Sequence, residues 1–436
     1  MPEALSREAL GGLGFLVLGA LVFLRVPIAI AMGAVGIGGS LLLTSVKKTG
    51  LIVSATAFDS VFPYALSVIP LFILMGVLIS HAGISTKLYQ GMHALLGHRP
   101  GGLAQSTIGA CALFGAVCGS SLATAATMTR VALPEMKAKG YADTLATGSI
   151  AAGGTLGILI PPSIILMIYG ILTGTSIGKL FIAGLIPGLL GTLLYLAAVR
   201  YIVWRDPSSG PVDERLPWPE RLRRLLGIWD VLLLFGLVLG GIYTGWFSTI
   251  EAAAVGAALS LFAAMIRTRS LRFLPGAVEE AAMTTAMIFL IIACTAIFNG
   301  FIERTHLPQL LVGYVSDSNL EPLAVVALIL LVYLLLGCVM DGLSIIFVTI
   351  PIVFPVVQSV GIDPVWFGIL VVCATEIGLI TPPVGMNLFV IKGLAGAIDI
   401  RTIWRGVLPF IAADLLRLAI LFAFPILTLW LTTAIS

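Results

Sequence analysis

The sequence GILIPP (Gly157–Pro162) returns 221 residues later as GLITPP (Gly378–Pro383). Adjacent prolines remove two backbone N–H donors and clash with the preceding turn, so each pair breaks a helix. A segment interrupted by Gly and Ser precedes each pair at a similar distance, GAVCGSSLAT (Gly115–Thr124) and GCVMDGLSII (Gly337–Ile346). Two further matches keep the order and nearly the same offset: AVGIGGSLLL from Ala34 with AVGAALSLFA from Ala254, and Ile186-Pro187 with Leu408-Pro409. These matches predict a duplicated architecture.

The composition around these motifs is that of a membrane protein. Of the 436 residues, 59% belong to the set AVILMFWYC and 10% are charged, and the mean hydropathy is +1.11. Soluble domains average about 25% charged residues. Apolar stretches long enough to cross roughly 30 Å of hydrocarbon recur along the whole chain. These values exclude a soluble enzyme, a nucleic-acid-binding protein and a disordered chain, and they predict an all-α polytopic membrane protein.

The sequence lacks the usual motifs for disulfides, metal sites and nucleotide binding. The five cysteines lie in apolar segments without CxxC spacing, the four histidines are scattered, and no Walker A motif is present. We therefore expect no disulfide, no transition-metal site, no cofactor and no direct use of ATP. The longest polar stretch, from about Arg205 to Arg224, is too short to build a soluble core. We interpret the amino terminus as the start of the first span rather than a removed signal peptide.

Loop charges predict that the two copies are inverted. Basic residues flank segment 102–136 on both sides, whereas no Lys or Arg flanks its counterpart, 321–357. Because Lys and Arg mark cytoplasmic loops, the first hairpin is expected to open to the cytoplasm and the second to the opposite side. The same rule places three further stretches in the cytoplasm: 200–224, 267–272 and 398–405. Inverted repeats are typical of secondary transporters, although some channels also contain them.

The predicted organisation follows from these assignments. An N-terminal span (1–26) comes first, followed by a first inverted repeat (27–203) that contains a re-entrant hairpin (102–136) and a broken helix (141–173). A cytoplasmic loop (204–224) and a connecting span (225–248) come next. The second inverted repeat (249–436) contains the second hairpin (321–357) and the second broken helix (363–398).

Polar groups gather at the first hairpin tip and the first break. Two glycines let the chain reverse in Gly115–Thr124, and Ser120, Ser121 and Thr124 supply hydroxyls at what should be mid-bilayer depth. The Pro161-Pro162 break releases carbonyls upstream. Hydroxyls and carbonyls together form an oxygen-only environment suited to Na⁺, and half-helix amino termini beside them favour an anion. Alternatively, these small residues only permit close helix packing; their repetition in the second copy favours a site.

Two carboxylates stand out in the second copy. A carboxylate near the membrane centre costs roughly 2.5–3.5 kcal/mol on insertion scales, so it normally has a partner or a function. Asp341, in the second tip, either holds a cation, orients the substrate or caps the tip. Glu376 either takes part in ion coupling or hydrogen-bonds backbone freed by the adjacent break. Asp414 and Arg417, three residues apart on one predicted helix, are expected to pair.

Several ordered segments resemble the large membrane subunit of tripartite ATP-independent periplasmic (TRAP) transporters. They are PLFILMGVLIS (Pro70–Ser80), FGAVCGSSLATAATMTRVALPEM (Phe114–Met136), GGTLGILIPPSI (Gly153–Ile164), MDGLS (Met340–Ser344) and EIGLITPPVGMNLFV (Glu376–Val390). The resemblance covers nearly the whole chain and departs at Thr129, where many relatives are expected to have Gly. It implies an elevator-type transporter, not an enzyme, in a bacterial or archaeal cytoplasmic membrane, with a periplasmic C-terminus.

The resemblance also implies ligands and partners. It implies Na⁺-driven uptake of organic acids such as C4-dicarboxylates or sugar acids, delivered by a periplasmic substrate-binding protein, and a small four-helix membrane subunit on a separate chain. The implied sodium-binding residues lie at the two tips and breaks: Gly119, Ser120, Thr124, Gly154, Thr155, Gly157 and Pro161 in the first copy, and Gly337, Asp341, Gly342, Thr375, Gly378 and Thr381 in the second. The implied substrate-binding residues are Ser120, Ser121, Thr124, Asp341, Ser344 and Asn387.

Two rival functions stay open on the sequence alone. A self-sufficient ion-coupled carboxylate transporter of similar inverted-hairpin design would need neither a binding protein nor a small subunit. An ion channel would conduct through weak, multi-site binding, but the sequence offers no ring-forming acidic or carbonyl filter motif.

Overall fold

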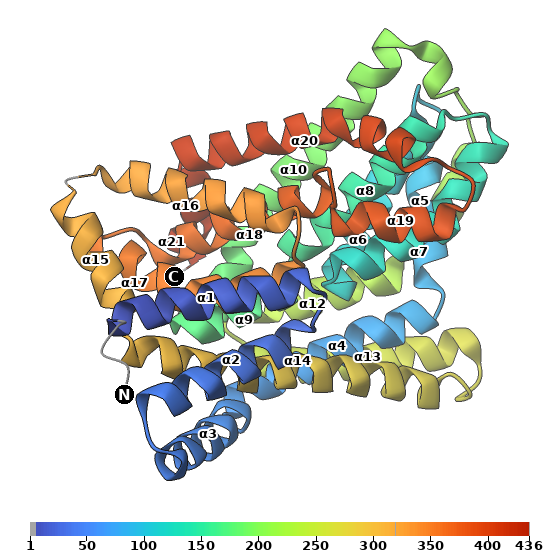
Figure 1. Ribbon diagram of the computed structural model, residues 1–436. Helices are drawn as coiled ribbons and strands as arrows, with labels where there is room; N and C mark the ends of the chain where they lie inside the picture. Colours follow the sequence, from blue (N-terminus) through green and yellow to red (C-terminus); the bar gives the residue numbers. More distant parts are fainter. Residues whose placement is uncertain (1–5, 319, 436) are drawn as a thin grey trace. The chain divides into compact units, whose positions relative to one another are not determined.

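The computed structural model describes residues 6–318 and 320–435, which form helices, turns and irregular segments, with no strand in these ranges (Figure 1). Seven of the described helices are long and apolar enough to cross a membrane. The number is eight if α11 (Trp218–Leu226) and α12 (Trp229–Tyr243), which meet at 47°, form one span. The expectation of an all-helical chain with several apolar helices is confirmed and agrees with a polytopic membrane protein.

The chain divides into two compact units. Unit 1 comprises the described parts of Met1–Ser67, Ala282–Ile329 and Leu343–Pro364. Its elements are α1 (Arg7–Phe23), α2 (Ile28–Leu43), α3 (Val46–Val61), the 3₁₀ turn η1 (Tyr64–Ser67), most of α14 (Leu274–Arg304), α15 (Leu307–Asp317), the first half of α16 (Pro322–Gly337) and nearly all of α17 (Gly342–Ser359).

Unit 1 is held together by close packing of α2 on α14. A Cβ atom on Gly36 would lie 2.8 Å from the backbone of Phe298, so the two helix backbones approach as only a glycine permits. The Phe15 ring meets Phe298 edge to face, with 5.1 Å between centroids. The buried core here comprises Leu18, Ala31, Met32, Val35, Phe298, Phe301 and Ile302.

Unit 2 comprises Val68–Ala281, Leu330–Gly342 and the described part of Val365–Ser436. Its elements besides α11 and α12 are α4 (Val68–His81), α5 (Ile84–Leu96), α6 (Gly102–Cys118), α7 (Ser121–Ala138), α8 (Asp143–Leu159), α9 (Ile164–Thr173), α10 (Ile177–Arg205), the turn η2 (Pro207–Ser209), α13 (Thr249–Thr268), the start of α14, the second half of α16, nearly all of α18 (Pro364–Ile380), α19 (Met386–Ala395), α20 (Ile400–Ala423) and α21 (Ile426–Ile435).

Four helix pairs occupy the segments predicted as hairpins and broken helices. Helices α6 and α7 are separated only by residues 119–120, and α8 and α9 by residues 160–163. In the second copy, residues 338–341 separate α16 from α17, and residues 381–385 separate α18 from α19. Helices α6, α16 and α18 contain 16 or 17 residues each. At 1.5 Å per residue they are about 25 Å long, shorter than the hydrocarbon layer.

A loop following α10 binds the open end of the first hairpin. The Gly101 amide donates to the Gly210 carbonyl and the Ala142 amide to the Ser209 carbonyl, both at 3.0 Å. Between them, the Tyr141 hydroxyl donates to the Pro211 carbonyl at 2.9 Å. Residues 209–211 thereby fasten the start of α6 and the start of α8 at one place.

Asp213 adds charged contacts to this loop. Its carboxylate accepts a hydrogen bond from Lys139 at 2.8 Å and lies 2.9 Å from His93 Nε2. Burial alone raises the pKa of Asp213, but hydrogen bonds from Lys139, the Glu214 amide and His93 outweigh it, so the pKa lies below its ordinary value. A lowered pKa means that Asp213 stabilises the folded state above about pH 4 and loses this contribution as the pH falls through the lowered pKa.

We expect Asp213→Asn to lower the melting temperature of the purified protein by a few degrees at pH 7, because the charge-assisted contacts are lost. The difference from wild type should shrink as the pH falls below 4 and through the lowered pKa of Asp213. Thermal unfolding from pH 7 to pH 3 measures both effects. Glu214→Gln, at an exposed position of the same loop, is the control. A pH-independent difference would show that Asp213 acts through shape and not charge.

Candidate functional site

The first hairpin tip is built by one glycine and one capping serine. Gly119 adopts the left-handed conformation (φ +63°) that ends α6. Ser120 then caps α7, its hydroxyl oxygen accepting from the Ala123 amide at 3.4 Å. The Thr124 hydroxyl donates to the Ser120 carbonyl at 2.7 Å. The tip therefore reverses the chain in two residues and places three hydroxyls next to a helix amino terminus.

This tip lies directly against the first break. A Cβ atom on Gly119 would come within 3.1 Å of the Pro162 carbonyl oxygen. One on Gly157 would come within 2.8 Å of Gly115 Cα and 3.0 Å of the Thr124 hydroxyl. The Pro161-Pro162 peptide bond is cis, and Ser163 then caps α9 by accepting from the Leu166 amide at 3.2 Å. The Thr124 hydroxyl of the tip and the Pro162 carbonyl of the break thus each lie beside a glycine of the other segment.

The second tip and break meet in the same way. A Cβ atom on Gly337 would lie 2.8 Å from Gly378 Cα, and one on Gly342 would lie 3.1 Å from Thr375 Cγ2. The Gly385 amide donates to the Cys338 carbonyl at 3.2 Å, which joins the break to the tip. The Pro382-Pro383 peptide bond is also cis. The hydroxyl of Thr375 is fully buried and has no hydrogen-bond partner in the described ranges.

A hydrogen bond joins the second break to the first tip. The fully buried Asn387, just after the second break, donates to the Ser121 hydroxyl of the first tip at 2.6 Å. Its amide oxygen finds no partner within the described part of the chain. A Cβ atom on Gly342, at the second tip, would also lie 2.7 Å from Ile165 just beyond the first break. Both tips and both breaks therefore belong to one cluster within unit 2.

The predicted residues divide between the units as follows. Unit 2 contains Gly119, Ser120, Ser121, Thr124, Gly154, Thr155, Gly157, Pro161, Gly337, Asp341, Gly342, Thr375, Gly378, Thr381 and Asn387, whereas Ser344 belongs to unit 1. The Thr155 side chain is engaged away from the tip, with its hydroxyl 2.9 Å from the Tyr195 hydroxyl. The Thr381 hydroxyl donates to the Ile377 carbonyl at 2.6 Å.

Comparison with known proteins identifies the family. The model of the family described as "Tripartite ATP-independent periplasmic transporter, DctM component" matches residues 15–427. The chain belongs to this family. It is 39% identical to the C4-dicarboxylate TRAP transporter large permease protein DctM of Pseudomonas aeruginosa over 85% of this chain and 87% of that protein. It is 35% identical to the sialic acid TRAP transporter large permease protein SiaM of Vibrio cholerae, over 84% and 86% of the two chains.

The fold resembles that of a solved transporter. The crystal structure of the YdaH transporter of Alcanivorax borkumensis superposes with a TM-score of 0.65, covering 88% of this chain and 90% of that one at 15% sequence identity. At this identity the likeness concerns the fold alone. Family and fold together make the chain a multi-pass membrane transporter permease rather than an enzyme.

The permease also contains a buried charged network that the sequence analysis found only in part. The predicted Asp414–Arg417 pair is confirmed, with 3.0 Å between Arg417 Nη2 and Asp414 Oδ1. The same nitrogen donates to Glu376 Oε2 at 2.7 Å, and all three side chains are fully buried. Tyr195 donates to the other oxygen of Asp414. The network joins α18 and α20 to α10, and Tyr195 extends it to Thr155 on α8.

The glycine contacts between tips and breaks predict a measurable effect. Gly337→Ala would place a methyl group 2.8 Å from Gly378 Cα and 3.3 Å from the Thr375 carbonyl oxygen, and these backbone atoms of α18 leave it no room. We expect a loss of about 1–3 kcal/mol of stability from overpacking. Thermal unfolding should show it, while Gly236→Ala, with nothing within 4 Å of the added methyl group, stays at or above wild type. Equal melting temperatures for the two variants would contradict the close approach of α16 and α18.

Proposed function

We propose that the chain is the large permease of a Na⁺-coupled importer of small organic acids. The observation that carries the proposal is the single cluster in unit 2 that unites both tips and both breaks. Broken helices that meet at one place are the usual means by which secondary transporters bind a coupling ion and a substrate together. The cluster lies in a permease of the TRAP family, whose relatives named above transport C4-dicarboxylates and sialic acid.

The donor atoms of the cluster suit Na⁺. They are hydroxyl and main-chain oxygens with one carboxylate, Asp341, and the broken helices leave carbonyls at their ends without helical partners. Thr375 supports a second site most directly, because its buried hydroxyl has no partner among the described residues. For the first site, the Pro162 carbonyl beside Gly119 and the Thr124 hydroxyl beside Gly157 are the nearest oxygens. Thr155, engaged with Tyr195, contributes through its backbone in this proposal.

The same cluster suits an anionic substrate. Helices α7 and α19 begin at the tip and the break that Asn387 joins, and their unpaired N–H groups favour negative charge. Ser121, Thr124 and Asn387 would donate hydrogen bonds to a carboxylate, while Asp341 would border it. C4-dicarboxylates and sialic acid, named for the relatives, both carry carboxylates.

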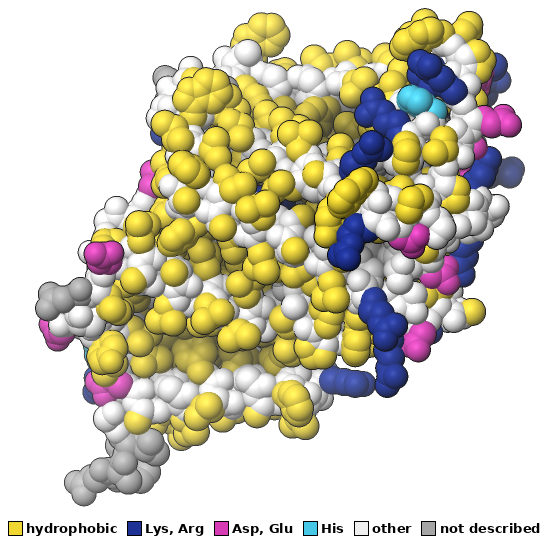
Figure 2. Space-filling view, turned by 90° about the horizontal axis from the view of Figure 1, so that it is seen from above, with side chains coloured by type: hydrophobic (Ala, Val, Ile, Leu, Met, Phe, Trp, Pro, Cys, Tyr) yellow, Lys and Arg dark blue, Asp and Glu magenta, His cyan; other side chains and the backbone are white. Residues whose placement is uncertain are grey.

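We assign the movement to the two hairpins and the two broken helices, and the scaffold to the remaining helices. An elevator carries its binding site with the moving part, and the tips and breaks of these segments form the cluster. A small membrane subunit and a periplasmic substrate-binding protein complete the proposed transporter in a cytoplasmic membrane. The positive-inside rule places the arginine-rich loops in the cytoplasm and the C-terminus in the periplasm. Hydrophobic side chains cover most of the face shown in Figure 2, as expected for a protein that contacts lipid.

The proposal is tested by uptake into proteoliposomes containing the permease, its small subunit and the binding protein loaded with its labelled ligand. An inward Na⁺ gradient should drive accumulation, and an equal K⁺ gradient should not. Strong uptake without the binding protein would favour a self-sufficient transporter. Unsaturable ion currents would favour a channel. Accumulation in K⁺ equal to that in Na⁺ would end the sodium assignment.

A further inference from the structure

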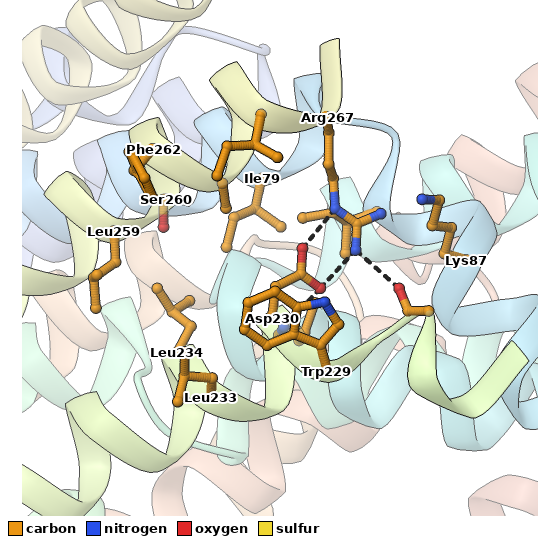
Figure 3. Close-up of a pocket in the computed structure, with 15 residues that line it drawn as sticks. Ile79, Lys87, Trp229, Asp230, Leu233, Leu234, Leu259, Ser260, Phe262 and Arg267 are labelled. Carbon is orange, nitrogen blue, oxygen red and sulfur yellow. Dashed lines mark hydrogen bonds and ion pairs between the residues drawn. The ribbon is translucent and has the colours of Figure 1, made fainter. Parts of the chain in front are cut away.

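A pocket of about 330 Å³ opens between α4, α5, α12 and α13 of unit 2 (Figure 3). Its walls are apolar for most of their length and include Ile79, Leu233, Leu234, Leu259, Phe262 and Ile266. Its charged residues, Lys87, Asp230 and Arg267, gather at one end beside Trp229. The pocket therefore has an apolar length and a polar mouth.

The polar mouth leaves part of one arginine without a partner. Arg267 donates to both carboxylate oxygens of Asp230 at 2.5 Å and to the Gly227 carbonyl at 2.9 Å. These contacts use Nε and Nη2, whereas Nη1 is buried and has no hydrogen-bond partner among the described residues. In Figure 3 this side of the guanidinium points toward the Lys87 amine. The mouth thus holds two cationic side chains, and Asp230, the carboxylate among the described lining residues, is already paired with Arg267.

The mouth lies where a membrane surface is expected. Helix α12 begins at Trp229 and α13 ends at Thr268, so both helix ends at the mouth adjoin arginine-rich sequence, RLRR (Arg221–Arg224) and RTRSLR (Arg267–Arg272). Helix α13 and the bent pair α11–α12 are both candidate spans. Trp229, 60% exposed, is of the residue type that prefers the membrane–water interface. The remainder of the pocket then faces the hydrocarbon.

We propose that this pocket binds one anionic phospholipid. Its phosphate lies between the Lys87 amine and Arg267 Nη1, and an acyl chain follows the wall formed by Leu234, Leu259 and Phe262. Lys87, Arg267 and Asp230 together leave one net positive charge, which an anionic headgroup neutralises. Basic pockets between helices on the cytoplasmic side are typical sites for such headgroups. A small soluble anion would gain nothing from the apolar walls, and a zwitterionic headgroup brings its own cation to a cationic mouth.

The test compares lipids that differ only in the headgroup. Delipidated, purified permease is titrated with phosphatidylglycerol or with phosphatidylcholine of the same acyl chains, and bound lipid is counted by native mass spectrometry. Wild type should retain phosphatidylglycerol preferentially. Lys87→Gln should weaken phosphatidylglycerol binding roughly fivefold, as expected for the loss of one basic group near an anionic lipid. Lys47→Gln, at another exposed lysine outside the pocket, should leave binding at the wild-type level.

Two further arms separate the other occupants. Ala263→Trp fills the groove and should abolish retention of phosphatidylglycerol; if this variant fails to fold, the comparison of Lys87→Gln with Lys47→Gln decides alone. Inorganic phosphate at millimolar concentration should not displace the lipid. The proposal is overturned if Lys87→Gln binds both lipids as wild type does. It is also overturned if inorganic phosphate displaces the lipid, or if Ala263→Trp folds and keeps the lipid.

Discussion

Replacing Arg417 with methionine is expected to remove most of the folded permease from detergent extracts. Arg417 is the only cation among the side chains that the structure records in contact with Glu376 and Asp414, and all three are fully buried. Methionine keeps much of the volume but leaves two carboxylates without a counter-charge. Removing one partner of a buried ionic group costs about 3–5 kcal/mol, against a total stability of about 5–15 kcal/mol for typical proteins.

Size-exclusion chromatography of a fluorescent fusion, together with the melting temperature, measures the loss. Arg405→Met, on the same helix but exposed, should behave as wild type. The triple variant Arg417→Met, Glu376→Gln, Asp414→Asn should recover much of the lost stability, because it removes the carboxylates as well as the arginine. Failure of the triple variant to recover would mean that Arg417 acts through packing. An Arg417→Met protein as stable as wild type would contradict the network itself.

The parts of this structure that the sequence predicts are local ones. The first tip falls at Gly119 and Ser120 because a glycine ends one helix and a serine caps the next, and both signals lie within adjacent residues. Pro161-Pro162 and Pro382-Pro383 mark the breaks for an equally local reason, the lack of N–H groups. Asp414 and Arg417 are three residues apart, so one helical turn brings them together.

Contacts between distant segments escaped the sequence analysis for a physical reason. Asn387 and Ser121 are 266 residues apart, and Glu376 and Arg417 are 41 apart on different helices. No periodicity along the chain encodes such pairs, because they depend on how α18, α19 and α20 pack on the first copy. The charged residues within apolar segments were the one sequence feature that could have indicated the Glu376–Arg417 pair. Glu376 and Asp414 in apolar segments require counter-charges, and Arg417 is deep in a neighbouring apolar segment.

The structure records two kinds of contact for Glu376. Its carboxylate accepts a hydrogen bond from Arg417, and the backbone of Leu159, the last residue of α8 before the first break, also interacts with it. Glu376 therefore connects α18 to α20, next to Thr375 and two residues before Gly378. A rigid support for site residues is what precise ion coordination needs, since a small displacement of the oxygens weakens binding. The coupling role of Glu376 itself stays a prediction.

The second large effect is expected at the tips, where Ser120→Ala, Thr124→Ala and Asp341→Ala should each abolish Na⁺-driven uptake. Each substitution removes an oxygen from the proposed sodium or substrate contacts. An interaction with a charged group is worth about 1.5–3 kcal/mol, which corresponds to at least about a tenfold rise in the Na⁺ concentration needed for half-maximal uptake. Uptake by the complete transporter in proteoliposomes, measured over a range of Na⁺ concentrations, tests the prediction.

Thr129→Ala is the matched control for Thr124→Ala. Both hydroxyls are buried on α7 and both donate to the carbonyl four residues earlier, at 2.7 Å for Thr124 and 2.6 Å for Thr129. Only Thr124 lies beside the break, 3.0 Å from where a Cβ of Gly157 would be. A general weakening of the helix would affect both variants equally, whereas a sodium site at the tip affects Thr124→Ala alone. Membrane insertion and melting temperature should stay near wild type in all four variants, because no substituted side chain fills a large apolar volume. Unchanged Na⁺ dependence in the three tip variants would remove the tip from the site.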